Sequence, residues 1–290
     1  MAEKRVIKVR NLELGSGRPK ICIPVTAANR EELAAQVERI LDSPCDMVEW
    51  RAAFFERAGC ETGDTDVAAK DTDGAVKNGD VAAKDTDGAV KTAASSVSWI
   101  LEPLAFLRER LGEKALLFTF RTKEEGGECS ISLDEYRRLN EAAAASGLAD
   151  LIDVELNRGE ELLQGLAAFA HQKGCLVVGS FHDFFGTPSG ETLTELLRRM
   201  QSLGADVTKA AVMPCTDRDV MTLLDASLAM KEQYADRPYI TMSMGARGGI
   251  SRLCGMLTGS ALTFATAGAS SAPGQMNAQL VDRVLATLEM

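Results

Sequence analysis

Short apolar runs alternate with amphipathic stretches along almost the whole of this 290-residue chain. Apolar, β-branched runs of about four to eight residues are typical of buried strands, whereas apolar residues at helical spacing indicate helices. The pattern predicts strands over Lys20–Val25, Met47–Arg51, Ala115–Arg121, Leu151–Glu155, Cys175–Phe181, Val207–Met213, Tyr239–Met244 and Leu262–Thr266. Between them it predicts helices over Arg30–Leu41, Leu133–Ala145, Glu160–Gln172, Thr192–Leu203 and Val220–Tyr234, with a closing helix over Val281–Met290.

Eight strand–helix units in this length have the size and rhythm of a (β/α)8 barrel, whose sites lie at the carboxyl ends of the strands. An open doubly wound sheet is the alternative, but no Gly-x-Gly-x-x-Gly turn follows the first predicted strand. We therefore predict an α/β chain that forms one TIM-barrel domain over residues 1–290. The opening stretch Val6–Lys20, with Gly15-Ser16-Gly17 in its middle, predicts a β-hairpin ahead of the barrel.

A tandem repeat interrupts the alternation after the second strand. Residues 66–77 (DVAAKDTDGAVK) recur without change as residues 80–91, and two copies are too few for a solenoid, which needs about three. The polar, small-residue-rich segment 61–96 therefore predicts a disordered or mobile insertion. Asp71-Thr72-Asp73-Gly74 and its copy echo the start of a calcium loop, but the remaining ligands do not line up. A solvated loop is the preferred interpretation.

Composition narrows the class of protein. With 46% hydrophobic and 26% charged residues, the chain can bury a globular core. It shows neither the apolar stretch of a signal peptide nor a run of about 18 apolar residues, so we expect a cytoplasmic protein with no membrane partner. Seven cysteines without Cys-x-x-Cys spacing indicate reduced thiols rather than zinc or disulfides. The net charge of −10 argues against nucleic acid as a partner.

Lys209 is the first candidate for chemistry, because it lies inside the apolar strand Val207–Met213. Burial disfavours an ammonium and so favours the neutral, nucleophilic amine, which can attack a carbonyl to form an imine. His182, one of two histidines, directly follows the strand Cys175–Phe181. An imidazole there can move a proton beside such an imine. The other histidine, His171, lies in the polar end of a helix, where a structural role is expected.

Charged residues also occupy strands that should be apolar. Glu49 and Arg51 end the second strand, Arg121 ends the third, and Asp153 and Glu155 lie in the fourth. A period of two places Glu49 with Arg51, and Asp153 with Glu155, on one face of their strands. Any one such residue is usually part of a structural ion pair. So many buried charges are costly unless they are paired or bind a ligand, so together they predict a polar cavity.

The C-terminal region adds Arg252, in Gly249-Ile-Ser-Arg252, and the loop Gly268–Gln275 after the last strand. Backbone rich in Gly and Ser after the eighth strand suits an anionic group, and an arginine offers two parallel donors to a carboxylate or phosphate. An ordinary surface turn is the alternative for this loop.

Together these residues resemble the type I 3-dehydroquinate dehydratases, the Schiff-base enzymes of the shikimate pathway. The resemblance spans about residues 20–290 and implies a (β/α)8 barrel, a homodimer, and a hydro-lyase of aromatic amino acid biosynthesis that needs neither metal nor organic cofactor. Whether the role is biosynthetic or quinate-catabolic stays open. The matching stretches are Glu49-Trp-Arg51, Phe118-Thr-Phe-Arg121, Glu124-Glu-Gly-Gly127, Ile152-Asp-Val-Glu155, Ser180-Phe-His182, Lys209 with Ala211-Val-Met-Pro214, Met242-Ser-Met-Gly245, Ile250-Ser-Arg252 and Ser271-Ala-Pro-Gly-Gln275.

The resemblance also implies roles for single residues. Lys209 would form the imine, His182 would transfer the proton, and Glu125, with Asp153 behind it, would hold and polarise the imidazole. Two departures are the Ala53 that replaces an acidic residue usual two places after Arg51, and the insertion 61–96. The implied substrate pocket comprises Glu49, Arg51 and Arg121 near ring hydroxyls, Arg252, Ser271 and Gln275 around a carboxylate, and Met242, Met244 and Phe264 as apolar walls.

The implied reaction is the dehydration of 3-dehydroquinate to 3-dehydroshikimate. A protonated imine on Lys209 accepts electrons better than the ketone does, so neutral His182 can remove the neighbouring proton and later give it to the departing hydroxyl. A class I aldolase, which breaks a carbon–carbon bond through a similar imine, is the nearest alternative. A ligand-binding regulator without catalysis is another, and the insertion could be an interaction arm on an active enzyme.

Overall fold

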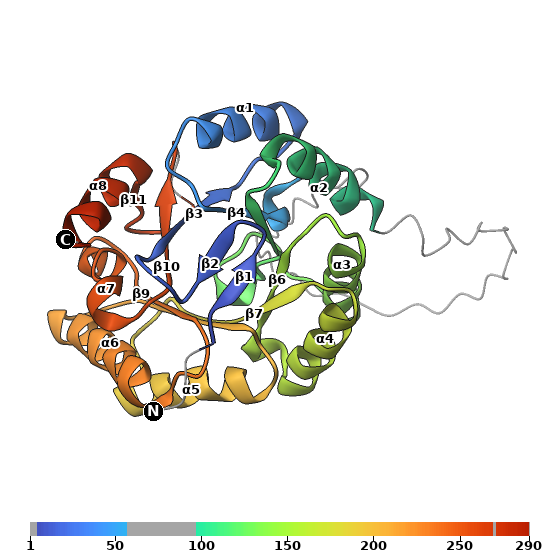
Figure 1. Cartoon of the computed structure of the whole chain (residues 1–290). Coiled ribbons are helices and arrows are strands. Elements are labelled where there is room, and N and C mark those ends of the chain that lie inside the picture. Colours follow the sequence, from blue (N-terminus) through green and yellow to red (C-terminus); the bar gives the residue numbers. More distant parts are fainter. Residues whose placement is uncertain (1–4, 57–96, 269–270, 290) are drawn as a thin grey trace, which may run out of the picture.

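Parallel strands form a barrel that is surrounded by helices, as the alternating pattern predicted (Figure 1). The computed structural model describes residues 5–56, 97–268 and 271–289. The described strands pair in the order β11-β10-β3-β4-β5-β6-β7-β8-β9, and the Ala261 N–H before β10 donates to the Tyr239 carbonyl in β9 over 2.8 Å, which brings the two ends together. The strands are β3 (Lys20–Val25), β4 (Met47–Arg51), β5 (Ala115–Thr119), β6 (Leu151–Glu155), β7 (Leu176–Asp183), β8 (Val207–Val212), β9 (Tyr239–Ser243), β10 (Leu262–Thr266) and β11 (Met276–Asn277).

Successive side chains of each strand point alternately to the helices and into the barrel. In β4, Val48 and Trp50 belong to the core between sheet and helices, whereas Met47 packs in the barrel interior. Because the side-chain period of a strand is two, Glu49 and Arg51 lie on the same side as Met47. The predicted inward face of this strand is thus confirmed, and the charges sit nearer its carboxyl end than the methionine does.

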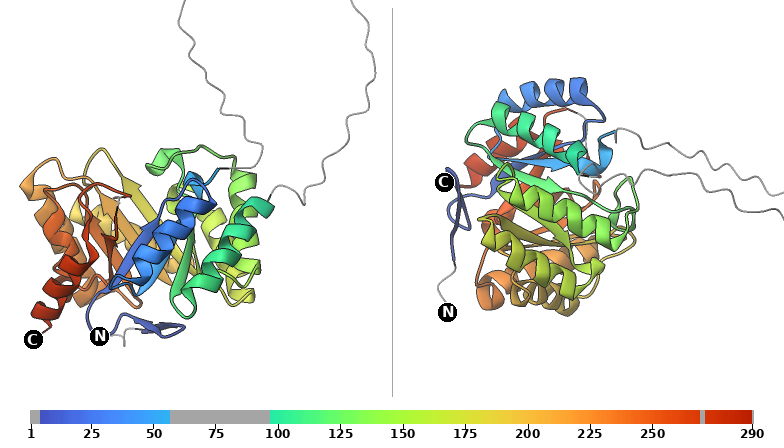
Figure 2. Two further views of the ribbon diagram at one scale, coloured as in Figure 1. Left: turned by 90° about the horizontal axis from the view of Figure 1, so that it is seen from above. Right: turned by 90° about the vertical axis from the view of Figure 1, so that its right-hand side faces the viewer.

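Helices cover the outside of the barrel, and polar residues begin several of them. Asn29 caps α1 by accepting from the Glu32 N–H over 3.0 Å, and Thr216 forms a capping box with Asp219 at α6. Figure 2 shows the helices packed side by side around the strands. The helices are α1 (Arg30–Leu41), α2 (Ser98–Leu111), α3 (Leu133–Ala145), α4 (Glu160–Gln172), α5 (Gly190–Ser202), α6 (Asp217–Ala229), α7 (Gly255–Thr258) and α8 (Ala278–Leu288), with 3-10 turns η1 (Ala52–Phe54), η3 (Lys123–Glu125), η4 (Leu156–Arg158) and η6 (Gly249–Arg252) and a π-turn η5 (Met230–Tyr234).

Helix α2 is absent from the sequence-based helices. Pro103 lies inside it and cannot donate a backbone hydrogen bond, which disfavours a helix interior. The buried residues Ile100, Leu104, Leu107 and Leu111 nevertheless recur at helical spacing. Burial of this apolar face outweighs the cost of the proline.

A β-hairpin closes the amino-terminal end of the barrel, as predicted, but its turn lies elsewhere. Strands β1 (Ile7–Val9) and β2 (Leu12–Leu14) pair antiparallel across Arg10-Asn11, with Arg10 at φ +52°, so Gly15–Gly17 follow the hairpin rather than form its turn. Figure 2 shows the hairpin lying across the lower end of the barrel. Its four buried apolar side chains pack with interior residues of the barrel strands, among them Cys22, Met47, Ala115, Leu151 and Val207.

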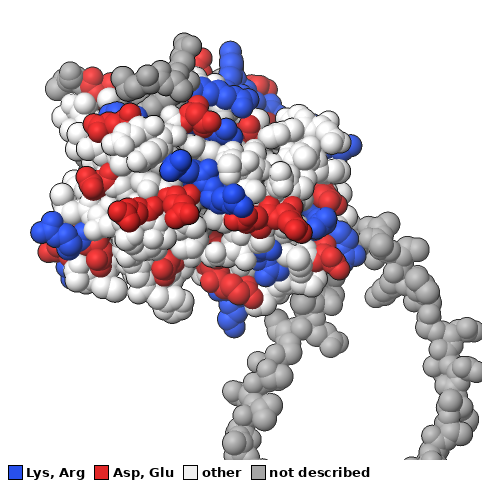
Figure 3. Space-filling model, turned by 90° about the horizontal axis from the view of Figure 1, so that it is seen from below, with Lys and Arg blue, Asp and Glu red and all other residues white. Residues whose placement is uncertain are grey.

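Surface charge is mixed on the face in Figure 3, where acidic and basic side chains lie interspersed rather than in separate fields. None of the helices in the described ranges has the length and apolar character that a membrane crossing requires. The predicted insertion 61–96 lies outside the described residues.

Candidate active site

A cavity of about 100 Å³ opens at the carboxyl ends of the barrel strands. Such a position is typical of active sites in this architecture. Twelve of the thirteen residues that the sequence analysis assigned to the site line it, and Asp153 lies behind them. The twelve are Glu49, Arg51, Arg121, Glu125, His182, Lys209, Met242, Met244, Arg252, Phe264, Ser271 and Gln275.

The sequence analysis missed Gly126 and Phe184, which also line the cavity. Phe184 follows His182 by two positions, so the strand period could have placed the two side chains on one face. A Cβ on Gly126 would meet the Phe184 ring at 2.2 Å, and Gly126 has φ +79°. Only glycine therefore permits the ring to lie against this turn.

Adjacent strands bring Lys209 and His182 to one side of the sheet. Lys209 of β8 pairs in register with Ser180 of β7, and His182 lies two residues farther along β7. A period of two puts Ser180 and His182 on the same face, toward which Lys209 also points. The lysine is 4% exposed and the histidine side chain 8%. An amine and an imidazole thus meet in one sheltered cavity.

The Lys209 amine lies among groups that attract an ammonium. Its Nζ atom is 3.5 Å from Asp153 Oδ2, 3.8 Å from Glu49 Oε1 and 4.6 Å from the centre of the Phe264 ring. Carboxylates and an aromatic face both attract a positively charged nitrogen. The Lys209 nitrogen therefore lies between carboxylates from two strands, β4 and β6.

Asp153 contacts other groups than the imidazole it was expected to support. Its Oδ1 atom accepts from Ser180 Oγ over 2.6 Å and from Arg121 Nη2 over 2.7 Å, while Oδ2 faces Lys209. Burial alone would raise its pKa, but Arg121 and Lys209 together lower the pKa of this carboxyl group below its ordinary value. Asp153 is thus an ionised counter-charge to the lysine.

Glu125 is the carboxylate that holds the imidazole. Its Oε2 atom lies 2.8 Å from His182 Nδ1. Burial, and then Arg121 and Lys209, lower the pKa of His182 well below its ordinary value, so the ring is neutral near pH 7. Burial raises the pKa of Glu125 to about 8; Arg121 opposes this rise and the nearby carboxylates add to it. A neutral imidazole oriented through Nδ1 keeps Nε2 for proton transfer.

Arg121 is fully enclosed by carboxylates at the base of the cavity. Its guanidinium donates to Asp153 over 2.7 Å, to Glu155 over 2.9 Å and to Glu125 over 3.3 Å. Three acidic partners raise the pKa of the guanidinium although burial lowers it. Arg121 therefore orders the acidic groups of the site, in addition to the contact with ring hydroxyls that the resemblance implied.

Arg252 has the opposite surroundings. It is 2% exposed, its Nη2 atom donates to the Pro273 carbonyl over 3.0 Å, and its Nη1 atom lies 3.7 Å from Met242 Sδ. Its Nε atom is buried without a hydrogen-bond partner, and no carboxylate in the described residues forms an ion pair with it. Burial lowers its pKa to about 10. A buried guanidinium in this state is prepared for an anion from outside the chain.

The loop after β10 folds back over the site, so the described part of it is more than a surface turn. Ser271 N donates to Gln275 Oε1 over 2.9 Å, and Gln275 Nε2 donates to Ser271 Oγ over 2.9 Å. The Gly245 N–H donates to the Pro273 carbonyl over 3.1 Å. Gly274, at φ +76°, approaches Gly245 so closely that a Cβ would lie 2.2 Å from its carbonyl oxygen. Ser271 and Gln275 are thus held beside Arg252.

Comparison with known proteins decides the family. A model described as type I 3-dehydroquinase matches residues 21–290. The 3-dehydroquinate dehydratase of Clostridioides difficile is 41% identical over 282 residues, which cover 97% of this chain and 96% of that protein. The chain belongs to the type I 3-dehydroquinase family. The 3-dehydroquinate dehydratase of Syntrophotalea carbinolica is 40% identical over 284 residues, 98% of each protein.

Solved type I structures share the fold. The enzyme from Clostridium difficile superposes with a TM-score of 0.83 at 40% identity and 99% coverage of both chains. The 3-dehydroquinate dehydratase of Geobacillus kaustophilus gives 0.81 at 36% identity, with 98% of this chain and 96% of that chain covered. These comparisons confirm both the predicted barrel and the family resemblance.

Ala53 is the departure from the type I pattern that lies within the described residues. It is buried in η1, in the core that faces the helices, and it does not line the cavity. Its carbonyl accepts from Cys129 Sγ over 3.6 Å. A carboxylate at this position would therefore lie behind the cavity rather than in its lining.

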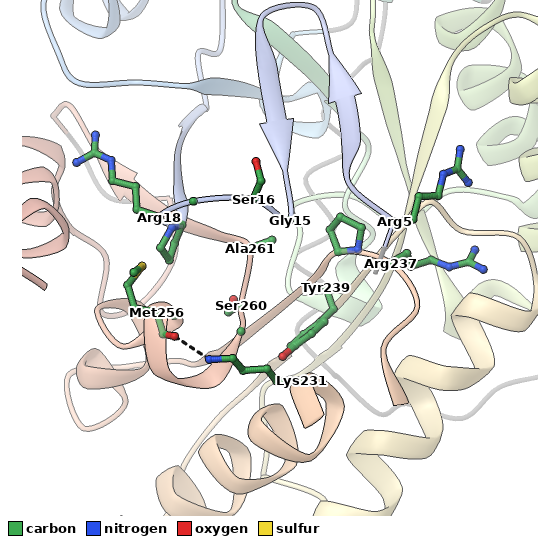
Figure 4. Close-up of a pocket in the computed structure, with 15 residues that line it drawn as sticks. Arg5, Gly15, Ser16, Arg18, Lys231, Arg237, Tyr239, Met256, Ser260 and Ala261 are labelled. Carbon is green, nitrogen blue, oxygen red and sulfur yellow. Dashed lines mark hydrogen bonds between the residues drawn. The ribbon is translucent and has the colours of Figure 1, made fainter. Parts of the chain in front are cut away.

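A second cavity lies at the other end of the type I barrel (Figure 4). Arg5, Arg18 and Arg237 line it, but their charged ends extend away from its centre. Arg18 pairs with Asp282 over 2.7 Å, and Lys231 Nζ donates to the Met256 carbonyl over 3.0 Å. Neither histidine nor carboxylate is among the described residues that line this cavity, and the Tyr239 hydroxyl donates to the Thr258 carbonyl over 2.6 Å.

Proposed function

We propose that this protein is a 3-dehydroquinate dehydratase, a hydro-lyase that converts 3-dehydroquinate to 3-dehydroshikimate through an imine on Lys209. The observation that carries the proposal is the buried Arg252, which lacks an acidic partner in the described residues and lines the same cavity as the Lys209 amine. A ligand that satisfies both groups carries a carboxylate and a carbonyl. The relatives at 41% and 40% identity are 3-dehydroquinate dehydratases.

A solved relative supports the same ligand chemistry. The Clostridium difficile structure contains covalent modified comenic acid. Comenic acid is a ring compound that bears a carboxylate and a ring carbonyl, which are the two groups that this cavity is arranged to meet.

The reaction begins when the Lys209 amine attacks the ketone of the substrate and water leaves, which forms a protonated imine. His182 removes a proton from the neighbouring ring carbon, and the electron pair of that C–H bond passes to the imine nitrogen as an enamine. The enamine then expels the hydroxyl of the next carbon, and His182 returns its proton so that the hydroxyl leaves as water. Hydrolysis of the imine frees the product and restores the amine.

The remaining residues bind the substrate. Arg252, with Ser271 and Gln275, holds the carboxylate, which fixes the reacting carbon beside the imidazole and so catalyses by positioning. Glu49, Arg51 and Arg121 bind ring hydroxyls. The apolar walls exclude water from the enamine, and they comprise Met242, Met244 and Phe264, to which the geometry adds Phe184.

Borohydride reduction in the presence of 3-dehydroquinate tests the proposal. The reductant should add one ligand mass to the chain, on the peptide that carries Lys209, and a Lys209→Met variant should stay unlabelled. Lys173→Met is the matched control, because this lysine is exposed and should leave labelling intact. Labelling at another lysine would refute the assignment. Absorbance of an enone product, in place of a released aldehyde, separates dehydration from an aldolase reaction.

We also propose a cytoplasmic homodimer of single-domain chains, as the family resemblance implies. Light scattering on the purified protein should give about twice the chain mass of 31.1 kDa. Deletion of residues 61–96 should leave turnover intact if the insertion is an accessory arm.

A further inference from the structure

Glu155, the last residue of β6, is fully buried and does not line the cavity. Three donors hold its carboxylate. Its Oε1 atom accepts from Arg121 Nη1 over 2.9 Å and from the Thr122 N–H over 2.8 Å, and its Oε2 atom accepts from Thr122 Oγ1 over 2.7 Å. A buried carboxylate with this many charged and polar partners fixes the groups around it. The residues that it holds, Arg121 and Thr122, directly precede Glu125 and its turn in the chain.

The turn from Thr122 to Gly127 is folded onto Thr122. The Thr122 carbonyl accepts from the Glu125 N–H over 3.0 Å and from the Gly127 N–H over 2.8 Å. A Cβ on Gly127 would lie 2.0 Å from the Arg121 carbonyl oxygen, so the backbone passes itself closely here. The position of Glu125 therefore depends on Thr122, and Thr122 is held by Glu155 through both its amide and its hydroxyl.

Glu155 also competes with Glu125 for Arg121. The Nη1 atom of Arg121 lies 2.9 Å from Glu155, 3.1 Å from Ser180 Oγ and 3.3 Å from Glu125 Oε2. The Nη1 atom carries two hydrogens, so it donates mainly to the two nearer acceptors, Glu155 and Ser180. The shorter contact of Glu125 is the one to His182 Nδ1, at 2.8 Å. The carboxylate is thus directed to the imidazole rather than to the guanidinium.

We infer that Glu155 is a positioning residue for the dehydration: from β6 it holds Arg121 and Thr122 so that the Glu125 carboxylate stays on the imidazole of His182. The inference rests on the proposed function, because it concerns the acid–base pair of that reaction. The charged groups that face Glu125 are Arg121, Asp153, Glu155 and His182. Burial is the largest cause of the raised pKa of Glu125, and the charge of Glu155 adds to it.

Glu155→Gln tests the part played by the charge. Glutamine keeps the shape and an acceptor oxygen for Arg121 and the Thr122 amide, and its NH₂ group can donate to the Thr122 hydroxyl. Without the negative charge, Arg121 draws the Glu125 carboxylate away from the imidazole, so kcat/KM should fall by roughly 10- to 100-fold. The pKa of Glu125 should fall as well. Because the ionised carboxylate is the form that accepts Nδ1–H, the rise of kcat/KM with pH should move to lower pH.

Thr122→Val and Thr122→Ser test the part played by the hydroxyl. Valine has nearly the shape of threonine but cannot donate to Glu155, whereas serine keeps the donor and loses only a methyl group. The valine variant should lose kcat/KM and the serine variant should retain it. A side chain that mattered only for packing would give the reverse order, which would overturn the inference.

The imidazole itself gives a direct readout. The chain has two histidines, so His171→Gln assigns the nitrogen NMR signals of His182. In the Glu155→Gln variant the Nδ1 signal should show a weakened hydrogen bond. An unchanged signal, with an unchanged rate and pH profile, would overturn the inference.

Borohydride labelling separates this inference from the proposed function. Neither Glu155 nor Thr122 contacts the lysine amine in any described hydrogen bond, so all three variants should still be labelled at Lys209. Loss of labelling and turnover in the unaltered protein would refute the proposed function itself. If the unaltered protein is active and Glu155→Gln has the same kcat/KM, pH profile and Nδ1 signal, this inference alone is refuted. If Glu155→Gln does not fold, the Thr122→Val and Thr122→Ser pair decides.

Discussion

The Nδ1 atom of His182 lies 2.8 Å from Oε2 of Glu125. Burial lowers the pKa of the histidine and raises the pKa of the glutamate, so it favours the neutral form of each. A histidine and a carboxylate at this distance on a protein surface would be an ion pair. Here burial opposes both charges, so the imidazole is neutral near pH 7, and the pair acts as a base once Glu125 is ionised and accepts Nδ1–H. That condition suits a base that must also act as an acid.

Removal of the imidazole should separate binding from turnover. In His182→Ala, Lys209 should still be labelled by borohydride with 3-dehydroquinate, whereas turnover should fall by about 10²- to 10⁴-fold for each proton transfer that the ring assists. The matched control is His171→Ala, because His171 contacts Asp206 over 2.7 Å, and Asp206 lies just before the amino end of β8, away from the carboxyl ends of the strands where the cavity opens. Near-normal turnover in His182→Ala would remove this residue from the mechanism.

Arg252→Met should weaken catalysis and leave the folded protein at least as stable. Charge-assisted hydrogen bonds contribute about 1.5–3 kcal/mol, so kcat/KM should fall roughly 10- to 100-fold. The melting temperature without ligand should stay the same or rise, because a buried guanidinium without an acidic partner is costly. Arg247→Met is the control, since Arg247 pairs with Asp217 on the surface. A large loss of stability in Arg252→Met would contradict the view that this arginine awaits an anion.

Stability should depend on pH through Glu125. Its folded pKa of about 8 lies above the ordinary value of 4.5, so between these values the folded chain holds a proton that the unfolded chain has released. Stability of the unaltered protein therefore declines as pH rises from about 4.5 to about 8. Glu125→Gln lacks this titration. Between pH 5 and pH 8 its free energy of unfolding in urea, relative to that of the unaltered protein, should therefore rise by a few kcal/mol at most.

The other titrating group of the pair does not disturb this comparison. His182 has a pKa below its ordinary value of 6.5, so its own contribution to stability grows as pH rises toward 6.5. That contribution is present in both proteins and largely cancels in their difference. A difference that stays constant across this pH range would show that Glu125 is ionised throughout.

Gly274→Ala should displace the loop that carries Ser271. The new Cβ would lie 2.2 Å from the Gly245 carbonyl oxygen, so the backbone must move and substrate affinity should fall. Gly174→Ala is a close control: Gly174 has φ +73°, close to the +76° of Gly274, but nothing lies within 4 Å of its Cβ position. Both variants should lose about 1–2 kcal/mol of stability from the left-handed backbone, whereas Gly274→Ala alone should raise KM.

Local pattern accounts for most of the fold that the sequence predicted. Strand β4 and helix α1 have the predicted bounds because their apolar residues keep one period from end to end. Helix α2 was not predicted because Pro103 is a local signal against a helix. The apolar face that stabilises the helix does so only by packing against the rest of the barrel. The hairpin turn at Arg10-Asn11 was misplaced because the nearby glycines are a stronger turn signal than the residues that form it.

The membership of the site and the contact between Glu125 and His182 were predictable, but the partners of Asp153 were not. Strand ends and the family resemblance pointed to Glu125, Asp153 and Lys209 as neighbours. Which carboxylate meets the imidazole and which meets the amine depends on the register between β6, β7 and β8, a relation between distant segments. Phe184 was missed for a related reason, since its place depends on a glycine turn from another strand.

The hairpin of β1 and β2 has a consequence for the order of events. Because its apolar side chains pack against the interior residues at the amino-terminal end, the cavity that holds Lys209 opens, in the described residues, at the carboxyl ends of the strands. Substrate, product and the three water molecules that are released or consumed on the way then use that opening in turn. A product that lingers there blocks the next substrate directly, so inhibition by product should be competitive.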